Sequence, residues 1–141
     1  MRHVIFKLND SCFGLPVNYV REILRSPEIH RLPQSPDFID GVINVRQYHV
    51  AVMNLRKCLG FPPRNGDCRV IMAVWERKVI GLIVDEVSEI LEIDSSEIEA
   101  MRRIGPGYLD TKSIQGICLK GEREIFLLSI ENLLKERLAG V

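Results

Sequence analysis

Hydrophobic and polar residues alternate along most of the chain in short runs that predict β-strands. The clearest runs lie near the middle, where residues 41–45 and 50–55 alternate on either side of a short polar turn. A period of two with β-branched residues is typical of strands. Residues 69–75 and 79–84 are apolar on both faces. Such runs predict a hairpin that is buried on both sides.

The same alternation predicts strands near both ends of the chain and after the buried hairpin. These strands cover residues 4–8, 12–15, 28–32, 87–93, 113–119 and 124–128. No strand–helix–strand alternation is present, which argues against a parallel sheet and for small antiparallel barrels. About ten strands in 141 residues fit two five-stranded barrels better than one. The sequence therefore predicts a mainly β fold of two packed barrels.

A single domain with two barrel subdomains is expected from the length of the chain. The strands between residues 41 and 93 are contiguous, so the second subdomain is expected to use about residues 41–111. The first is expected to use about residues 1–40 and 112–141, closed by the return of the chain. The crossover is predicted at Gly105, Pro106 and Gly107, where a Gly-Pro-Gly triplet breaks the pattern.

A few short helices are predicted from capping and breaking residues. They cover residues 16–24, 55–59, 95–101 and 130–138. Asn54 caps the second helix and Gly60 ends it. Asp94 and Glu97 have the spacing of a capping box at the third. Ser129 caps the last helix, which is amphipathic and closes the chain.

Composition narrows the possible functions. The 19 basic and 19 acidic residues balance, and the sequence pI is about 6.8. A neutral chain lacks the electrostatic footprint of a nucleic-acid binder and the polybasic segment of a protein that binds anionic membranes. No apolar run approaches the length of a membrane span, and no signal peptide is evident. A cytoplasmic protein with no nucleic-acid partner and no membrane insertion is expected.

Residues with reactive or metal-binding side chains form no recognised catalytic or metal-binding pattern. The cysteines are far apart, at Cys12, Cys58, Cys68 and Cys118, and the three histidines are scattered. This spacing predicts neither a metal site nor a cofactor. The cysteines are expected to be free thiols in a reducing compartment. No nucleophile elbow or phosphate loop is present, so we expect no enzyme activity. A cysteine-based sensor using Cys68 remains an alternative, because a base need only be close in space.

Arg46 stands where a buried strand passes into a turn. A guanidinium anchored there by the barrel could form two parallel hydrogen bonds with a carboxylate. For a lone arginine, a solvated turn charge is the alternative interpretation.

At this point the sequence resembles a known family. Residues 41–46, Gly-Val-Ile-Asn-Val-Arg, are followed by an apolar strand and by Asn-Leu-Arg at residues 54–56. This combination resembles the central motif of CheW-like domains. Other stretches resemble further family elements, so the resemblance covers nearly the whole chain. They are residues 13–15, 20–23, 32–39, 79–87 and 125–134.

The resemblance implies two five-stranded SH3-like barrels packed through a shared core. It also implies a noncatalytic scaffold in bacterial chemosensory arrays. CheW-like adaptors bridge the cytoplasmic tip of a chemoreceptor, a methyl-accepting chemotaxis protein, and the regulatory domain of the histidine kinase CheA. The alternative within the family is a divergent module that serves a signalling system other than chemotaxis.

The resemblance also implies roles for individual residues. Arg46 matches the motif arginine associated with receptor coupling, and Glu22 matches the glutamate expected to pair with it. Val20 and Gly81 match positions that line a groove between the barrels. The remaining motif residues are Gly41, Asn44, Asn54, Leu55 and Arg56.

Three positions depart from the family pattern. Gln47 stands where glycine is usual, so a turn that relies on positive φ is expected to change shape. Ala51 replaces a proline, and Asn54 replaces an aspartate that could pair with Arg56. These departures are expected to affect the choice of partner rather than the fold.

Overall fold

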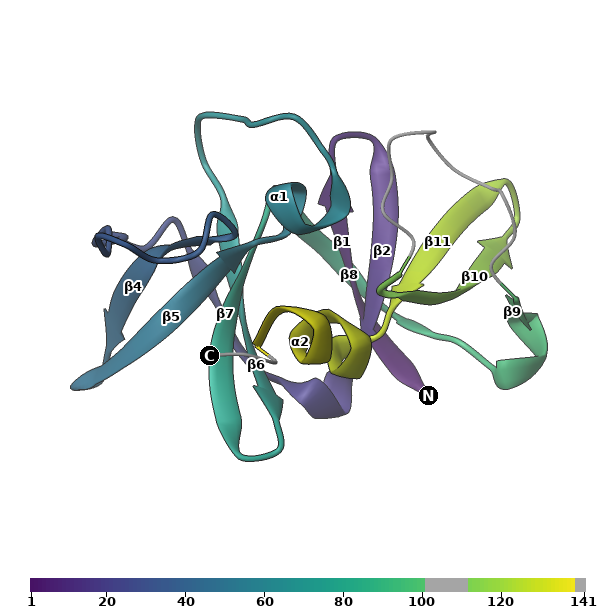
Figure 1. Cartoon of the computed structure of the whole chain (residues 1–141). Helices are drawn as coiled ribbons and strands as arrows, with labels where there is room; N and C mark the ends of the chain where they lie inside the picture. The colour runs from purple at the N-terminus through teal and green to yellow at the C-terminus, as the bar shows by residue number, and fades with distance from the viewer. Residues whose placement is uncertain (101–111, 139–141) are drawn as a thin grey trace.

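Two β-sheets, each curled into a barrel, lie side by side in the computed structural model, which describes residues 1–100 and 112–138 (Figure 1). The first barrel has the strand order β8 (Glu86–Glu92), β1 (Arg2–Leu8), β2 (Ser11–Pro16), β11 (Arg123–Leu128), β10 (Ile114–Lys120) and β9 (Ile98–Glu99). The second has the order β3 (Val20–Arg25), β6 (Arg69–Trp75), β7 (Lys78–Val84), β5 (Tyr48–Asn54) and β4 (Ile39–Val45). Each sheet contains one parallel pair, β2 with β11 and β5 with β7. The predicted mainly β architecture is confirmed.

The predicted assignment of strands to the two barrels needs correction. β3 belongs to the second barrel, where it pairs with β6. β8 and β9 belong to the first, where β8 pairs with β1. The chain therefore leaves the first barrel after β2 and returns to it at Asp85, between β7 and β8. The prediction assumed that segments adjacent in the sequence share a barrel, whereas β3 and β8 each pair with a strand of the other barrel. The crossover predicted at Gly105, Pro106 and Gly107 lies outside the described residues.

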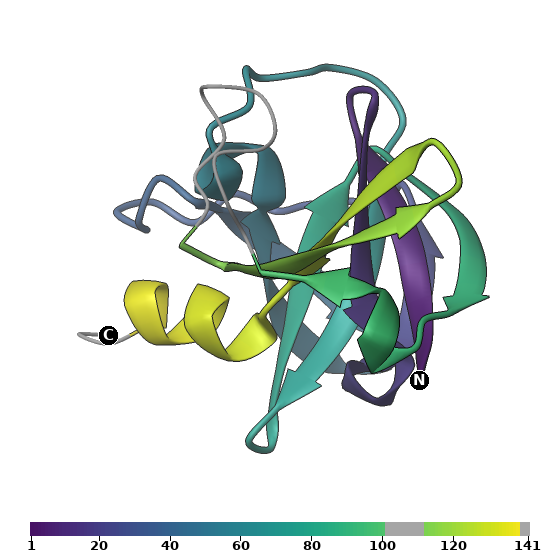
Figure 2. The same cartoon turned by 90° about the vertical axis from the view of Figure 1, so that its right-hand side faces the viewer.

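A core shared between the barrels is the largest of three apolar clusters. Both sheets contribute to it, and so do α1 (Leu55–Leu59) and α2 (Ile130–Leu138). Phe13 lies at its centre, with ring centroids 5.6 Å from Phe6, 6.0 Å from Phe61 and 5.5 Å from Phe126. α2 lies between the two barrels in Figure 1, and Figure 2 shows that it lies on one face of the molecule. Smaller clusters fill each barrel, so the two barrels form one packed unit.

Three local predictions differ from the structure. The helix predicted for residues 16–24 is a single 3₁₀ turn, η1 (Val17–Tyr19), followed by β3, because every second residue of the strand is half-buried against β6. Residues 28–32 do not form a strand, and only His30 makes an isolated bridge, to Val42. The helix predicted after Asp94 ends within one turn, as η2 (Ser95–Glu97).

The predicted caps are confirmed. The Asn54 side chain accepts a hydrogen bond from the Arg56 backbone N–H, and Gly60 ends α1 with a φ of 88°. The Ser129 hydroxyl accepts from the Asn132 N–H at the start of α2. Within the described ranges, no helix has both the length and the apolar character needed to cross a membrane.

Candidate functional site

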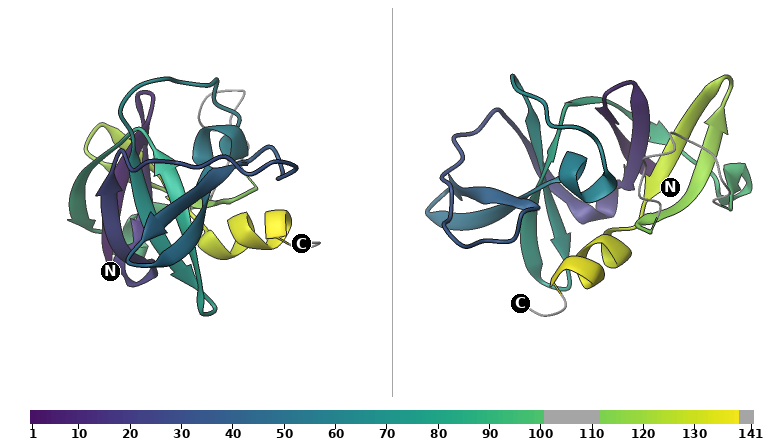
Figure 3. Two further views of the ribbon diagram at one scale, coloured as in Figure 1. Left: turned by 90° about the vertical axis from the view of Figure 1, so that its left-hand side faces the viewer. Right: turned by 45° about the horizontal axis from the view of Figure 1, so that its top comes forward.

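The turn between β4 and β5 lies at the side of the second barrel that faces away from the first (Figures 1 and 3), and Arg46 is one of its two residues. Val45 pairs with Tyr48, so the loop contains two residues. Arg46 and Gln47 have φ values of 47° and 74°. Two positive φ values are the mark of a type I′ turn, which matches the twist of the flanking strands. Gln47 therefore keeps the backbone that glycine would adopt, and the turn is strained rather than reshaped.

Arg46 forms a bidentate ion pair with Glu22. Its Nη1 and Nη2 atoms lie 2.8 and 3.0 Å from Oε1 and Oε2 of the carboxylate. The Arg46 side chain is 73% exposed and that of Glu22 is 23% exposed. β3 and the β4–β5 hairpin lie at opposite edges of the same sheet. The pair expected from the resemblance is thus present, and it joins the two free edges of the second barrel.

A pocket of about 460 Å³ opens beside this ion pair. Its lining comes entirely from the second barrel: Arg21, Glu22, Val45, Arg46, Tyr48, His49, Val50, Met72 and Val79. The apolar members are buried or half-buried, and the charged and aromatic members stand at the rim. An apolar floor with a few polar groups around it is typical of a binding site.

Two residues predicted to line a groove between the barrels lie elsewhere than in this pocket. Gly81 is buried inside the second barrel, and a Cβ added there would lie 2.7 Å from Val52 Cγ1 and 2.8 Å from Val70 Cγ1. A side chain at this position would collide with the valine side chains of the neighbouring strands β5 and β6. Val20 is half-buried at the start of β3 and packs against the shared core.

The motif residues before Arg46 shape the hairpin. A Cβ on Gly41 would lie 2.2 Å from the His30 carbonyl oxygen, so no other residue fits there. This close approach lets His30 and Val42 exchange two backbone hydrogen bonds of 2.8 Å. Asn44 Oδ1 lies 2.5 Å from the Nδ1 of its cross-strand neighbour His49. These contacts hold the hairpin that carries Arg46.

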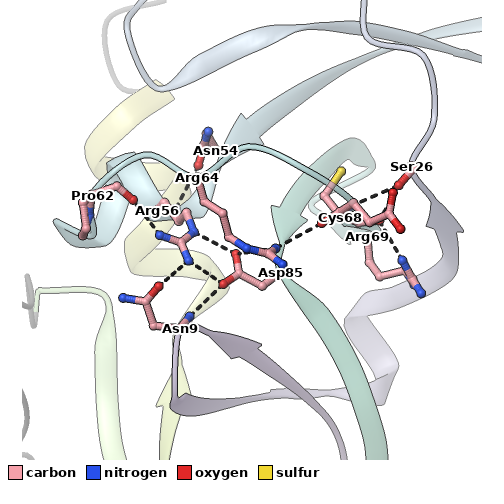
Figure 4. Close-up of polar contacts among 10 residues, drawn as sticks. Asn9, Ser26, Asn54, Arg56, Pro62, Arg64, Cys68, Arg69 and Asp85 are labelled. Atoms are coloured by element: carbon pink, nitrogen blue, oxygen red, sulfur yellow. Dashed lines mark hydrogen bonds and ion pairs between the residues drawn. The ribbon is translucent and has the colours of Figure 1, made fainter.

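The motif arginine at the other end, Arg56, is buried at the junction of the barrels (Figure 4). Its Nε and Nη2 donate to Asp85 Oδ1 and Oδ2 at 2.8 and 2.5 Å. Nη1 donates to the Pro62 carbonyl at 2.6 Å, and Nη2 also donates to Asn9 Oδ1. Asn9 lies in the β1–β2 turn of the first barrel, whereas Arg56 lies in α1 beside the second. The network therefore fastens one barrel to the other.

Asp85 is held ionised in this network. Burial alone would raise the pKa of its carboxyl group, but hydrogen bonds from Arg56 and from the Asn9 N–H, together with the nearby arginine charges, lower that pKa. The Asn9 N–H donates to Asp85 Oδ2 at 2.7 Å. Sequence reasoning missed Asp85; the signal available was a carboxylate directly after a buried apolar strand.

Asn54, which replaces the usual aspartate, forms two hydrogen bonds through its side chain. Its Oδ1 caps α1, and its Nδ2 donates to Asp40 Oδ2 at 2.9 Å. Lys57 Nζ lies 3.1 Å from the other oxygen of Asp40. An aspartate at position 54 would place two carboxylates in contact, so asparagine suits this neighbourhood. Arg56 does not need a carboxylate at position 54, because Asp85 supplies one.

For two of the four cysteines, Cys68 and Cys118, burial disfavours the thiolate. All four are free, and Cys58 and Cys118 are buried. Burial raises the pKa of the Cys68 thiol, and the same cause raises the pKa of Cys118. A raised pKa disfavours the nucleophilic thiolate. In the part of the chain that the structure describes, no group of three or more His, Cys, Asp or Glu side chains could hold a metal ion.

These features define a class of protein: a two-barrel module whose polar networks hold a surface hairpin and the junction of the barrels in place. Comparisons with known proteins identify the family. The CheW-like domain model matches residues 2–138. The chain therefore belongs to the CheW-like domain family.

Named relatives agree with this assignment. The probable chemotaxis protein CheW of Rhizobium etli is 33% identical over 94% of this chain and 86% of that protein. The chemotaxis protein CheW of Klebsiella aerogenes is 31% identical over 93% of this chain and 80% of that protein. The crystal structure of the scaffolding protein TtCheW from Thermoanaerobacter tengcongensis superimposes with a TM-score of 0.85 at 30% identity, covering 95% of this chain and 92% of that one. The predicted class of function, a chemotaxis scaffold or adaptor, is confirmed.

The strain at Gln47 leads to a stability prediction. Gln47→Gly is expected to raise the free energy of unfolding by about 0.5–1 kcal/mol, because relief of the left-handed conformation outweighs the greater freedom of glycine in the unfolded chain. Arg77→Gly is the matched control. Glu76 and Arg77 form the equivalent loop between β6 and β7, with φ values of 48° and 66°. Urea denaturation should give gains of similar size, and a loss with Gln47→Gly would contradict the assigned strain.

Proposed function

We propose that this chain is a noncatalytic adaptor that couples the cytoplasmic tip of a chemoreceptor to the regulatory domain of the histidine kinase CheA. It would act in the cytoplasm, at membrane-associated receptor arrays. Membership of the CheW-like family supports the class of partner. The observation that carries the proposal is the exposed, bidentate Arg46–Glu22 pair beside an apolar pocket. An arginine held in place yet open to solvent is suited to protein recognition.

A different class of function would require reactive groups. The raised pKa values of Cys68 and Cys118 argue against a thiol-based sensor. Asp85, the carboxylate with the lowered pKa at the barrel junction, is already bonded to Arg56 and Asn9. Both observations favour a binding role over catalysis.

Calorimetric titration tests the proposal directly. The protein is titrated with the CheA regulatory domain from its own genome and, separately, with a chemoreceptor tip fragment. We expect both to bind with dissociation constants in the range of about 1–100 μM, typical of transient signalling contacts. Heat changes at the level of dilution for both partners would contradict the proposal.

A divergent module in another signalling system is the second candidate, and the departures at Gln47 and Asn54 favour it. Both lie in the central motif, and Asn54 is adapted to its local neighbour Asp40. Binding of the kinase domain without binding of the receptor fragment would support this second candidate.

A further inference from the structure

Arg21 is a cation on the rim of the second-barrel pocket. It lies in β3, next to Glu22, and its side chain is exposed. Its side chain takes part in no hydrogen bond or ion pair with other described residues, whereas the neighbouring Glu22 carboxylate is engaged by both Nη atoms of Arg46. The charge of Arg46 is thus offset within the chain, and that of Arg21 is not. This leaves the rim with one uncompensated positive charge.

Tyr48 is an exposed aromatic residue at the same pocket. Its side chain is 73% exposed although it begins β5, directly after the strained turn. The cross-strand pair with Val45 and the Arg46–Glu22 ion pair restrict the motion of this segment. An exposed aromatic residue on a rigid turn gives contact area at a low cost in entropy.

The floor of the pocket is apolar. Val50 and Met72 are almost fully buried at its base, with exposed fractions of 7% and 2%. Val45 and Val79 are half-buried around them. The floor offers apolar surface to one inserted side chain, and the free cation at the rim favours a carboxylate next to that side chain.

We propose that this pocket is a specificity site for the receptor partner, which takes an apolar side chain flanked by a carboxylate that pairs with Arg21. Tyr48 covers the inserted side chain. Arg46 is a positioning residue here, since its ion pair with Glu22 holds the wall of the pocket. The inference rests on the proposed adaptor function and adds to it the chemistry of the segment that is recognised.

Charge reversal at Arg21 tests the inference. Arg21→Glu is expected to weaken binding of a chemoreceptor tip fragment about tenfold or more, because the carboxylate then meets a like charge. Raising the salt concentration from about 50 to 300 mM should shrink the difference, since a rim charge is screened. Arg25→Glu, which reverses an exposed charge on the same strand outside the pocket, is the matched control and should change affinity less than about twofold.

Two further variants test whether a loss of receptor binding arises at the pocket and at Arg21. Val79→Phe fills the pocket and should weaken the same fragment, while circular dichroism and binding of the CheA regulatory domain show that the fold is intact. A carboxylate-to-lysine change in the fragment should restore binding to Arg21→Glu.

The outcomes separate the two proposals. If the wild-type protein binds the fragment but Arg21→Glu binds as tightly as Arg25→Glu, the specificity site is wrong and the adaptor function stands. If the wild-type protein binds the kinase domain and no receptor fragment, the receptor half of the adaptor function fails, and the specificity site fails with it.

Discussion

Asp85→Ala is expected to lower the free energy of unfolding by about 3–5 kcal/mol, because it removes a carboxylate that pairs with the buried Arg56 guanidinium. Arg56 is only 6% exposed, and the Asp85 side chain is 11% exposed. Water therefore cannot replace the lost carboxylate without opening the junction between the barrels. Urea denaturation followed by circular dichroism measures the loss.

Glu89→Ala provides the matched control for a surface ion pair. Glu89 pairs with Arg123 at 3.0 Å, but the two side chains are 38% and 42% exposed. Removing such a pair typically costs less than about 1 kcal/mol. Equal losses for Asp85→Ala and Glu89→Ala would contradict the role assigned to the buried network.

The pKa of Asp85 also predicts a dependence of stability on pH. Because that pKa is lowered in the folded state, the folded protein binds fewer protons than the unfolded chain. The contribution of Asp85 is therefore complete above the ordinary carboxyl pKa of about 4 and is lost as the pH falls through the lowered value. Asp85→Asn should flatten this acid limb of the stability curve, and an unchanged slope would show that other carboxylates cause it.

Most of the strands and helices of this fold could be predicted from the sequence, but the assignment of strands to barrels could not. The caps at Asn54 and Ser129 depend on contacts within a few residues, so their sequence pattern was sufficient. β3 was read as a helix because its apolar residues also fit a helical spacing, and only pairing with β6 decides between the two. The sheet of each strand depends on contacts far apart in the chain.

The residues of the candidate site could also be predicted only in part from the sequence. Resemblance identified Arg46 and Glu22, which lie 24 residues apart and do form an ion pair. It did not indicate Arg21, Tyr48 or the apolar floor, because the lining of the pocket comes from five different strands and a turn. Asp85 was missed for a related reason, since its partners Arg56 and Asn9 are 29 and 76 residues away.

The two motif arginines have different physical roles. Arg56 is buried, and its network joins the barrels, so its loss should appear mainly in stability. Arg46 is largely exposed and makes its ion pair within the second barrel alone. Its loss should appear mainly in binding. A single substitution at each position separates the two roles.

Arg46→Ala is therefore expected to weaken binding of the chemoreceptor tip fragment about tenfold or more, which is the size of effect seen for anchoring residues at interfaces. The free energy of unfolding should change by no more than about 1 kcal/mol, because an exposed ion pair contributes little and alanine bears the same left-handed backbone cost as arginine. Calorimetry with the receptor fragment and urea denaturation on the same samples measure both quantities.

Binding of the CheA regulatory domain serves as the internal control for Arg46→Ala. It should stay within about twofold of the wild-type value if Arg46 acts on the receptor side only. A parallel loss for both partners would instead mean that the β4–β5 hairpin is shared between them. Glu22→Gln refines the result, because it keeps the shape of the side chain and removes the charge that holds Arg46. If Glu22→Gln weakens receptor binding as much as Arg46→Ala does, the arginine acts through its fixed position; if it does not, the guanidinium contacts the receptor directly.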